Sequence, residues 1–247
     1  MGLEIKIAPD NAALNRVAAA EFKSAAESAI ADHGWFSIAL SGGNTPRAVY
    51  ALLAQEFRAS LDWPKIHVFF GDERHVPSDH PDSNFRMADE ALLSRVSIPA
   101  ENVHRMRTEL EPEAAASAYE EQIRSVFKLK PAELPRFDLV LLGLGDDGHT
   151  ASLFPGTPAL NETTRVVVPN WVEKLKTFRI TMTFPVLNHA AEDLFIVSGA
   201  AKQEILKKVL GNSGTTAYPA QRVRPTHGRL LWLLDHDAAA SLPDTTR

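Results

Sequence analysis

The chain has 247 residues, of which 45% are hydrophobic and 23% are charged, and its formal net charge is −5. This composition is typical of a soluble globular protein and argues against disorder, a collagen-like repeat and membrane spans. The lack of a basic excess argues against a nucleic-acid-binding protein, and the lack of cysteine excludes a disulfide framework and thiol chemistry.

The N-terminal stretch 1–9 has no apolar signal segment. No apolar run of the chain approaches the roughly 18 residues of a membrane-spanning helix. We therefore expect a cytoplasmic protein, a monomer or a small homo-oligomer, with no membrane or nucleic-acid partner.

Short apolar runs rich in Val, Ile, Leu and Phe, each followed by Gly or Asp and then by a helical pattern, predict βα units and a parallel sheet. The first run, 4–8, is weak and leads into an Ala-rich helix from about Asn11 to His33, which Gly34 ends. The stronger runs follow at 35–40, 66–70, 137–142, 179–183, 194–197 and 230–234. Apolar residues at helical spacing between 112 and 130 predict a further amphipathic helix.

No linker, repeat or low-complexity tract interrupts this alternation of strands and helices. We therefore expect one domain over residues 1–247, with an α/β fold. Its sheet is predicted to be doubly wound and mostly parallel, with helices on both faces, as in Rossmann-like proteins. Ligands of such sheets bind outside the carboxyl ends of the strands, so the residues just after each run are the candidates for a site.

The first candidate segment consists of Ser41, Gly42, Gly43, Asn44, Thr45 and Pro46. Thr45 is the expected N-cap of the next helix and Pro46 its first residue. Two glycines let backbone N–H groups approach a ligand, and a helix N-terminus favours negative charge, so the segment predicts a phosphate cradle. The alternative is a tight turn without a ligand. The Lys of a nucleoside-triphosphate-binding loop is absent.

The glycines of 143–148 fit the spacing of a dinucleotide-binding loop. Asp146 and Asp147 would repel a pyrophosphate there, which argues against that function. His149 follows, with the Asp147 carboxylate two residues away, and this pairing suits a general base whose tautomer a carboxylate fixes. The alternative is a histidine that caps a helix or bonds a backbone carbonyl.

Asp72, Glu73 and Arg74 follow the 66–70 run, and this triplet predicts a guanidinium held by a neighbouring carboxylate and ready for an anion. The alternative is a surface salt-bridge turn. Downstream, the side chains of His75, Asp79, His80 and Asp82 resemble metal ligands. The prolines among them exclude the helix that would align them, so we expect no metal.

Arg179 opens a late strand, and Lys202 falls in the first helical turn after 198–200. A cation at that end of a helix is unfavourable to the helix dipole, which indicates a bound anion. Solvation of an exposed lysine is the alternative.

Together these segments resemble the 6-phosphogluconolactonase family, within a wider group that includes glucosamine-6-phosphate deaminases. The resemblance covers about 35–234 and is carried by 41–46 (SGGNTP), by 71–77 (GDERHVP) with Ser83, Asn84 and Met87, and by 143–155 (GLGDDGHTASLFP). It implies hydrolysis of 6-phospho-D-glucono-1,5-lactone to 6-phospho-D-gluconate in the pentose phosphate pathway. It also implies His149 as the catalytic base with Asp147 beside it, and neither metal nor organic cofactor.

With this resemblance the candidate residues receive roles. The candidate catalytic residues are His149, Asp147, Arg74 and Asp72, and the candidate phosphate-binding residues are Ser41, Gly42, Gly43, Asn44, Thr45, Arg179 and Lys202. The expected partner is a small sugar phosphate lactone.

Two rival functions are a deaminase and isomerase of amino sugar phosphates and a non-catalytic sugar-phosphate sensor. In the deaminases that the loop resembles, a glutamate lies five residues beyond the histidine, where this chain has Phe154. An aromatic ring cannot accept a proton, which favours the lactonase.

Overall fold

The computed structural model describes residues 3–211 and 217–243. Its main sheet has six parallel strands in the order β1-β9-β8-β5-β2-β3. These strands are β1 (Leu3–Ala8), β2 (Phe36–Leu40), β3 (Ile66–Phe70), β5 (Leu139–Leu142), β8 (Glu192–Val197) and β9 (Arg229–Asp235). A second sheet contains β4 (Asp72–Arg74), β6 (Val167–Val172) and β7 (Thr177–Met182), all antiparallel.

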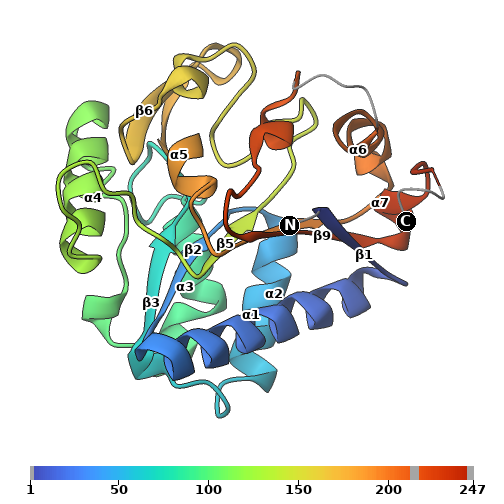
Figure 1. Ribbon diagram of the computed structural model, residues 1–247, viewed down its shortest axis with the longest axis horizontal. Helices are drawn as coiled ribbons and strands as arrows, with labels where there is room; N and C mark the ends of the chain where they lie inside the picture. Colours follow the sequence, from blue (N-terminus) through green and yellow to red (C-terminus); the bar gives the residue numbers. More distant parts are fainter. Residues whose placement is uncertain (1–2, 212–216, 244–247) are drawn as a thin grey trace.

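The α-helices lie on both faces of the main sheet, with α1, α2 and α3 on one side and α4, α5 and α6 on the other (Figure 1). They are α1 (Asn11–His33), α2 (Asn44–Glu56), α3 (Asn84–Ala91), α4 (Pro112–Val126), α5 (Phe184–Leu187), α6 (Gln203–Leu210) and α7 (His236–Ala239). Because both faces are covered, every residue of β2 and β5 is buried, and such strands are apolar without alternation. The predicted α/β fold with a mostly parallel sheet is confirmed.

Local signals set the bounds of α1 as the sequence predicted. The Asp10 side chain accepts a hydrogen bond from the backbone N–H of Ala13 and caps the first turn. Gly34 ends the helix with φ of +94°, a conformation that side chains disfavour.

The 179–183 run was wrongly predicted as part of the parallel sheet. It belongs to β7, which pairs antiparallel with β6 and with β4. Only the short turn 173–176 separates β6 from β7, and a parallel pair needs a crossover of a dozen or more residues. β6 itself was missed because Pro169 and Asn170 interrupt its apolar pattern, and β4 was missed because all three of its residues are charged.

The start of α2 also differs from the prediction. The helix begins at Asn44, and its N-cap is Gly43 rather than Thr45. Gly43 adopts φ of +108°, which a residue with a Cβ disfavours, so the turn ends at this glycine. The Thr45 hydroxyl is hydrogen-bonded to the Ser198 hydroxyl at 2.9 Å instead of capping the helix.

Two buried tyrosines fix the carboxyl ends of β2 and β3. The Tyr50 hydroxyl donates to the carbonyl of Ser41 and accepts from its N–H, at 2.8 and 3.1 Å. The Tyr119 hydroxyl makes the same pair of bonds with Phe70. Each hydroxyl satisfies backbone groups where a ladder ends, so the loops that follow start from fixed positions.

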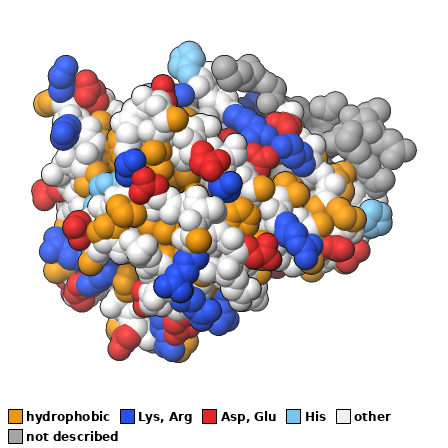
Figure 2. Space-filling model, turned by 90° about the horizontal axis from the view of Figure 1, so that it is seen from below, with side chains coloured by type: hydrophobic (Ala, Val, Ile, Leu, Met, Phe, Trp, Pro, Cys, Tyr) orange, Lys and Arg blue, Asp and Glu red, His pale blue; other side chains and the backbone are white. Residues whose placement is uncertain are grey.

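All six strands are parallel, but the order in which the chain adds them to the sheet reverses at β2, which has β3 on one side and β5 on the other. The loops after β2 and β5 therefore separate at this point and leave a crevice between them, the usual ligand position in an open α/β sheet. On the face seen in Figure 2, basic and acidic side chains lie interspersed. None of the helices in the described residues is long and apolar enough to cross a membrane.

Asp193 in β8 is fully buried, and neither of its carboxyl oxygens has a hydrogen-bond partner among the described residues. Burial, with a further contribution from Glu192, raises the pKa of Asp193 well above 3.8. Because the pKa of Asp193 is higher in the folded than in the unfolded state, the folded protein loses stability as the pH rises above the pKa of the unfolded state.

We expect Asp193→Asn to unfold at a higher temperature than the wild type at pH 8, and the difference to shrink towards pH 4. A difference in unfolding temperature that stays constant from pH 4 to 8 would contradict a raised pKa of Asp193.

Candidate active site

A cleft of about 340 Å³ opens at the carboxyl ends of the central strands, and the β6–β7 hairpin contributes to its wall. It is lined by Ser41, Gly42, Asp72, Arg74, Asn84, Gly143, Leu144, Gly145, His149, Thr150, Ala151, Ser152, Phe154, Lys174, Leu175 and Arg179. The cleft therefore joins the loops after β2 and β5 to side chains of the second sheet.

His149 lies in the loop after β5 and is paired with Asp147. Its Nδ1 is 2.5 Å from Oδ1 of Asp147, and its backbone N–H donates to the same oxygen at 3.1 Å. An ionised carboxylate accepts hydrogen bonds only, so Nδ1 of the neutral imidazole carries the proton. Nε2 has no hydrogen-bond partner in the described part of the chain, and its lone pair can accept a proton from a ligand or from water.

The environment of His149 favours the neutral ring. Burial lowers the pKa of His149 below 6.5 because desolvation disfavours the imidazolium, although Asp147 and Asp72 act in the opposite direction. The Phe154 ring stacks on the imidazole at a centroid distance of 4.0 Å and removes water from that side. A general base is neutral in its active form, so this environment suits proton abstraction.

Gly145 is required under the imidazole. A Cβ at this position would lie 1.9 Å from Nδ1 of His149. Its backbone N–H also donates to the carbonyl of His149 at 2.8 Å and closes the loop. The glycine that resembled part of a dinucleotide motif instead lets the histidine ring approach the backbone.

Arg74 and Arg179 lie side by side in the register of β4 and β7. Neither guanidinium has a salt-bridge partner within 4 Å among residues 3–211 and 217–243; Arg74 donates to the carbonyl of Asp82 at 2.6 Å. Burial and the charge of Arg74 lower the pKa of Arg179. The carboxylates of Asp72, Glu73 and Asp82 act in the opposite direction but form no ion pair with Arg179, so two adjacent cations make this wall of the cleft suited to an anion.

The sequence wrongly predicted that a neighbouring carboxylate holds Arg74. Glu73 is buried and accepts hydrogen bonds from the backbone N–H groups of Asn84 and Phe85, at the start of α3. Asp72 accepts from the Ser152 hydroxyl at 2.6 Å. Alternation along β4 sends Glu73 to the face opposite Arg74, whereas Asp72 shares the face of Arg74 but is hydrogen-bonded to Ser152.

Several buried polar atoms around this cleft have no hydrogen-bond partner within the described part of the chain. Four of its lining residues have such an atom: Oγ of Ser41, Oδ1 of Asn84, Oγ1 of Thr150 and Nε of Arg179. Unsatisfied buried groups are rare in proteins because each loses its hydrogen bonds with water. Their position around one cleft indicates that a polar ligand satisfies them.

Part of the predicted phosphate-binding set lies outside the lining of this cleft. Gly43, Asn44 and Thr45 do not line it, and Lys202 is paired with Asp146 at 2.5 Å. The sequence placed Lys202 in the first helical turn, and in the structure it ends the 3₁₀ turn Ala200–Lys202 and is the N-cap of α6. The Asp146 carboxylate of this chain provides the compensating negative charge. Asp147 is also not among the lining residues, and it contacts His149.

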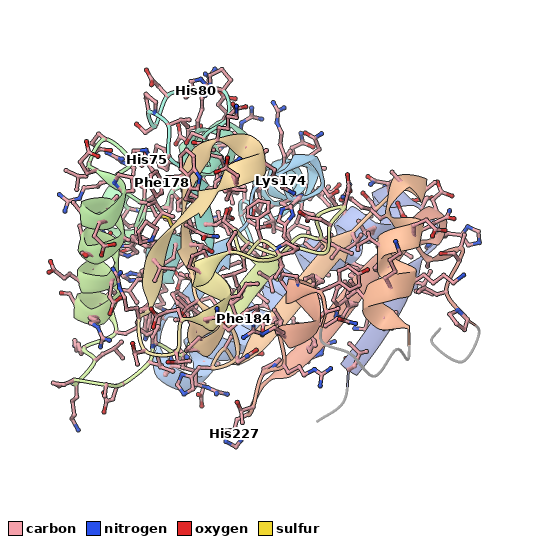
Figure 3. The ribbon with its side chains drawn as sticks, turned by 90° about the horizontal axis from the view of Figure 1, so that it is seen from above. His75, His80, Lys174, Phe178, Phe184 and His227 are labelled. Carbon is pink, nitrogen blue, oxygen red and sulfur yellow. The ribbon has the colours of Figure 1, made fainter. Side chains whose placement is uncertain are left out.

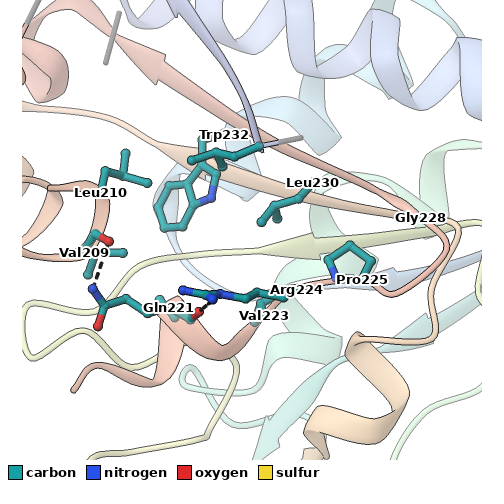
Figure 4. A pocket seen from close by; sticks show the side chains of 11 residues that line it. Val209, Leu210, Gln221, Val223, Arg224, Pro225, Gly228, Leu230 and Trp232 are labelled. Atoms are coloured by element: carbon teal, nitrogen blue, oxygen red, sulfur yellow. Dashed lines mark hydrogen bonds between the residues drawn. The ribbon is translucent and has the colours of Figure 1, made fainter. Parts of the chain in front are cut away.

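A second pocket, of about 300 Å³, lies beside β9 and α6 (Figure 4). Trp232, Leu230 and Val209 contribute apolar surface, and the Arg224 side chain donates to the carbonyl of Gln221 at 3.0 Å. Among the described residues, no histidine, aspartate or glutamate lines this pocket. The chemistry therefore points to the cleft at His149.

His75 and His80, two of the side chains that resemble metal ligands in the sequence, have other partners. Nε2 of His75 is 2.8 Å from the carbonyl oxygen of Leu110, and Nδ1 of His80 accepts from the N–H of Asp82. Within the described ranges no group of three or more His, Cys, Asp or Glu residues is arranged to hold a metal ion.

Sequence reasoning missed two kinds of lining residue. Lys174 and Leu175 come from the tip of the β6–β7 hairpin, and no motif or spacing marks them. Asn84 was noted within a motif but received no role, although its side chain donates to the carbonyl of Asp72 at 2.9 Å. A Cβ on Gly42 would lie 1.9 Å from Oδ1 of Asn84, so these two residues shape one corner of the cleft.

Comparisons with known proteins point to one family. Residues 9–232 match the model of the family described as glucosamine-6-phosphate isomerases/6-phosphogluconolactonase. The 6-phosphogluconolactonase of Synechocystis sp. is 48% identical over 87% of this chain and 88% of its own length, and that of Nostoc sp. is 44% identical over 96% and 98%. The structure of 6-phosphogluconolactonase from Trypanosoma cruzi matches with a TM-score of 0.88 and 32% identity, over 98% of this chain and 97% of that one.

Proposed function

The chain belongs to the glucosamine-6-phosphate isomerase/6-phosphogluconolactonase family, and we propose that it is a 6-phosphogluconolactonase. Such an enzyme hydrolyses 6-phospho-D-glucono-1,5-lactone to 6-phospho-D-gluconate in the oxidative pentose phosphate pathway. The observation that carries the proposal is the position of His149, whose Nδ1 is bound to Asp147 and whose Nε2 has no partner among the described residues, in a cleft that also contains Arg74 and Arg179.

In the proposed reaction, Nε2 of His149 accepts a proton from water while the water oxygen attacks the lactone carbonyl. The carbonyl oxygen becomes the oxyanion of a tetrahedral intermediate, and Arg74 stabilises it. The bond between the carbonyl carbon and the ring oxygen then breaks, and this oxygen takes the proton from the imidazolium. The products are a carboxylic acid, which releases its proton to solvent and becomes a carboxylate, and a hydroxyl group on the opened chain. Asp147 keeps the ring in the correct tautomer throughout.

We assign the 6-phosphate to Arg179 and the turn at Ser41 and Gly42. The Ser41 hydroxyl and Nε of Arg179 are both buried without partners, and a phosphate has oxygens for both. Lys202 can join them if its ammonium leaves Asp146. That exchange costs little, because 83% of the Asp146 side chain is exposed and exposed ion pairs contribute at most about 1 kcal/mol.

Phe154 argues against the deaminase function. It stacks on His149, in the position where the resemblance places a proton-handling glutamate in the deaminases, and its ring transfers no proton. A cytoplasmic location, one domain over 1–247 and a monomer or small homo-oligomer remain predictions from the sequence.

The first experiment compares lactone hydrolysis with ammonia release. We expect the purified protein to hydrolyse freshly made 6-phosphogluconolactone well above its spontaneous rate and to release no ammonia from glucosamine 6-phosphate.

His149→Ala is expected to lower kcat by roughly 10²- to 10⁴-fold, because proton transfer is lost. His227→Ala, a change distant from the hairpin tip in Figure 3, serves as the matched control and is expected to leave kcat unchanged. Ammonia release at a comparable rate, or full activity of folded His149→Ala, would refute the proposal.

The second experiment tests the anion site. Arg179→Gln is expected to lower kcat/KM for the phosphorylated lactone by roughly 10- to 100-fold, since a hydrogen bond to a charged group contributes about 1.5–3 kcal/mol. The loss for plain gluconolactone is expected to be much smaller, because this substrate has no dianion. Arg16→Gln, on the exposed surface of α1, is the control. Equal losses on both substrates would place Arg179 away from the phosphate.

A further inference from the structure

The tip of the β6–β7 hairpin reaches the catalytic loop from the other sheet. A 3₁₀ turn, Glu173–Leu175, forms this tip, and Lys176 follows it in the left-handed conformation with φ of +47°. Figure 3 shows Lys174 at the tip. Lys174 and Leu175 line the same cleft as His149, although they are separated from it by about one tenth of the chain.

The Lys174 ammonium contacts both groups that hold the His149 ring. It donates to Oδ2 of Asp147, while Oδ1 of the same carboxylate is 2.5 Å from Nδ1 of His149. It also lies 4.8 Å from the centroid of the Phe154 ring, whose face stacks on the imidazole. One cation thus links the carboxylate beside the base to the aromatic ring that stacks on it.

From these contacts we propose that Lys174 is a positioning residue, which fixes Asp147 and Phe154 around the His149 ring, so that Nδ1 stays bound to Asp147 and Nε2 remains available to the cleft. This inference rests on the proposed lactonase function. Lys174 acts through Asp147 and Phe154 and does not take part in proton transfer.

The charges around His149 agree with this role. The groups that act on the imidazole are Asp147 on its own loop, Asp72 on β4 and Lys174 on the hairpin. The two carboxylates favour the imidazolium, and the Lys174 charge opposes it. Burial would raise the pKa of Asp147, but hydrogen bonds from Lys174 and His149 lower it to about 2, so the carboxylate stays ionised as an acceptor.

The contribution of Lys174 to folding is small. Its side chain is 53% exposed, and an ion pair with such a partner contributes little to stability. Substitution of Lys174 is therefore expected to leave the protein folded and to change the base rather than the fold.

The test uses Lys174→Met, Lys174→Arg and the control Lys176→Met, which removes an exposed lysine from the same hairpin. Activity on 6-phosphogluconolactone is measured from about pH 5 to 8, and the pKa of His149 is measured by NMR titration without substrate. We expect Lys174→Met to lower kcat by roughly 10- to 100-fold, as a misplaced catalytic group does. The acid limb of kcat/KM and the pKa of His149 should both move to higher pH, because the cation that opposes the imidazolium is gone.

Lys174→Arg should restore kcat to within a few-fold and return the pKa, whereas Lys176→Met should match the wild type. An unchanged His149 pKa in Lys174→Met would overturn the inference. So would a rise in KM with kcat and the acid limb unchanged, which would mean that Lys174 binds substrate directly. If the wild type fails to hydrolyse the lactone, the proposed function fails, and the NMR titration still decides the role of Lys174.

Discussion

The hydrogen bond between Asp147 and Nδ1 of His149 determines which imidazole nitrogen can accept a proton. The Asp147 carboxylate accepts a hydrogen bond from the protonated Nδ1, so the free lone pair of the neutral ring is on Nε2. Two glycines of the loop make this contact possible. Gly145 leaves space for the ring, and Gly148 turns the chain with φ of +78°, where an added Cβ would also meet Tyr218 at 2.5 Å. Phe154 covers the ring, and burial shifts the pKa towards the neutral form.

The site depends on two sheets that meet at one edge. The parallel sheet supplies His149 and the turn at Ser41, at the point where strand order reverses, and the antiparallel sheet supplies Arg74, Arg179 and Lys174. Burial and the charge of Arg74 disfavour the charged form of Arg179, and the carboxylates of Asp72, Glu73 and Asp82 offset this only in part, because the pKa of Arg179 is lowered. The proposed binding of a phosphate beside Arg179 would add the negative charge that this wall of the cleft lacks.

The sequence predicted those parts of the molecule that local signals determine. Asp10 and Gly34 define α1, and strands covered on both faces are visible as apolar runs. It also selected His149, Arg74 and Arg179, which line one cleft, and Asp147, which contacts His149, because each was expected to follow or begin a strand; their roles stay predictions. It failed where a long-range contact decides the structure: β7 pairs with β4, far away in the chain, and Lys202 is compensated by Asp146. Lys174 has no neighbouring motif, and only the folded hairpin brings it to Asp147.

The tautomer of His149 is the most direct measurement of this account. A long-range ¹H–¹⁵N correlation spectrum of the ligand-free protein at about pH 7.5 distinguishes the two neutral tautomers and the imidazolium, and His149→Gln identifies the signals of this ring. The account predicts a neutral ring with the proton on Nδ1 and an unprotonated Nε2. A proton on Nε2, or a charged imidazolium at this pH, would contradict His149 as the base.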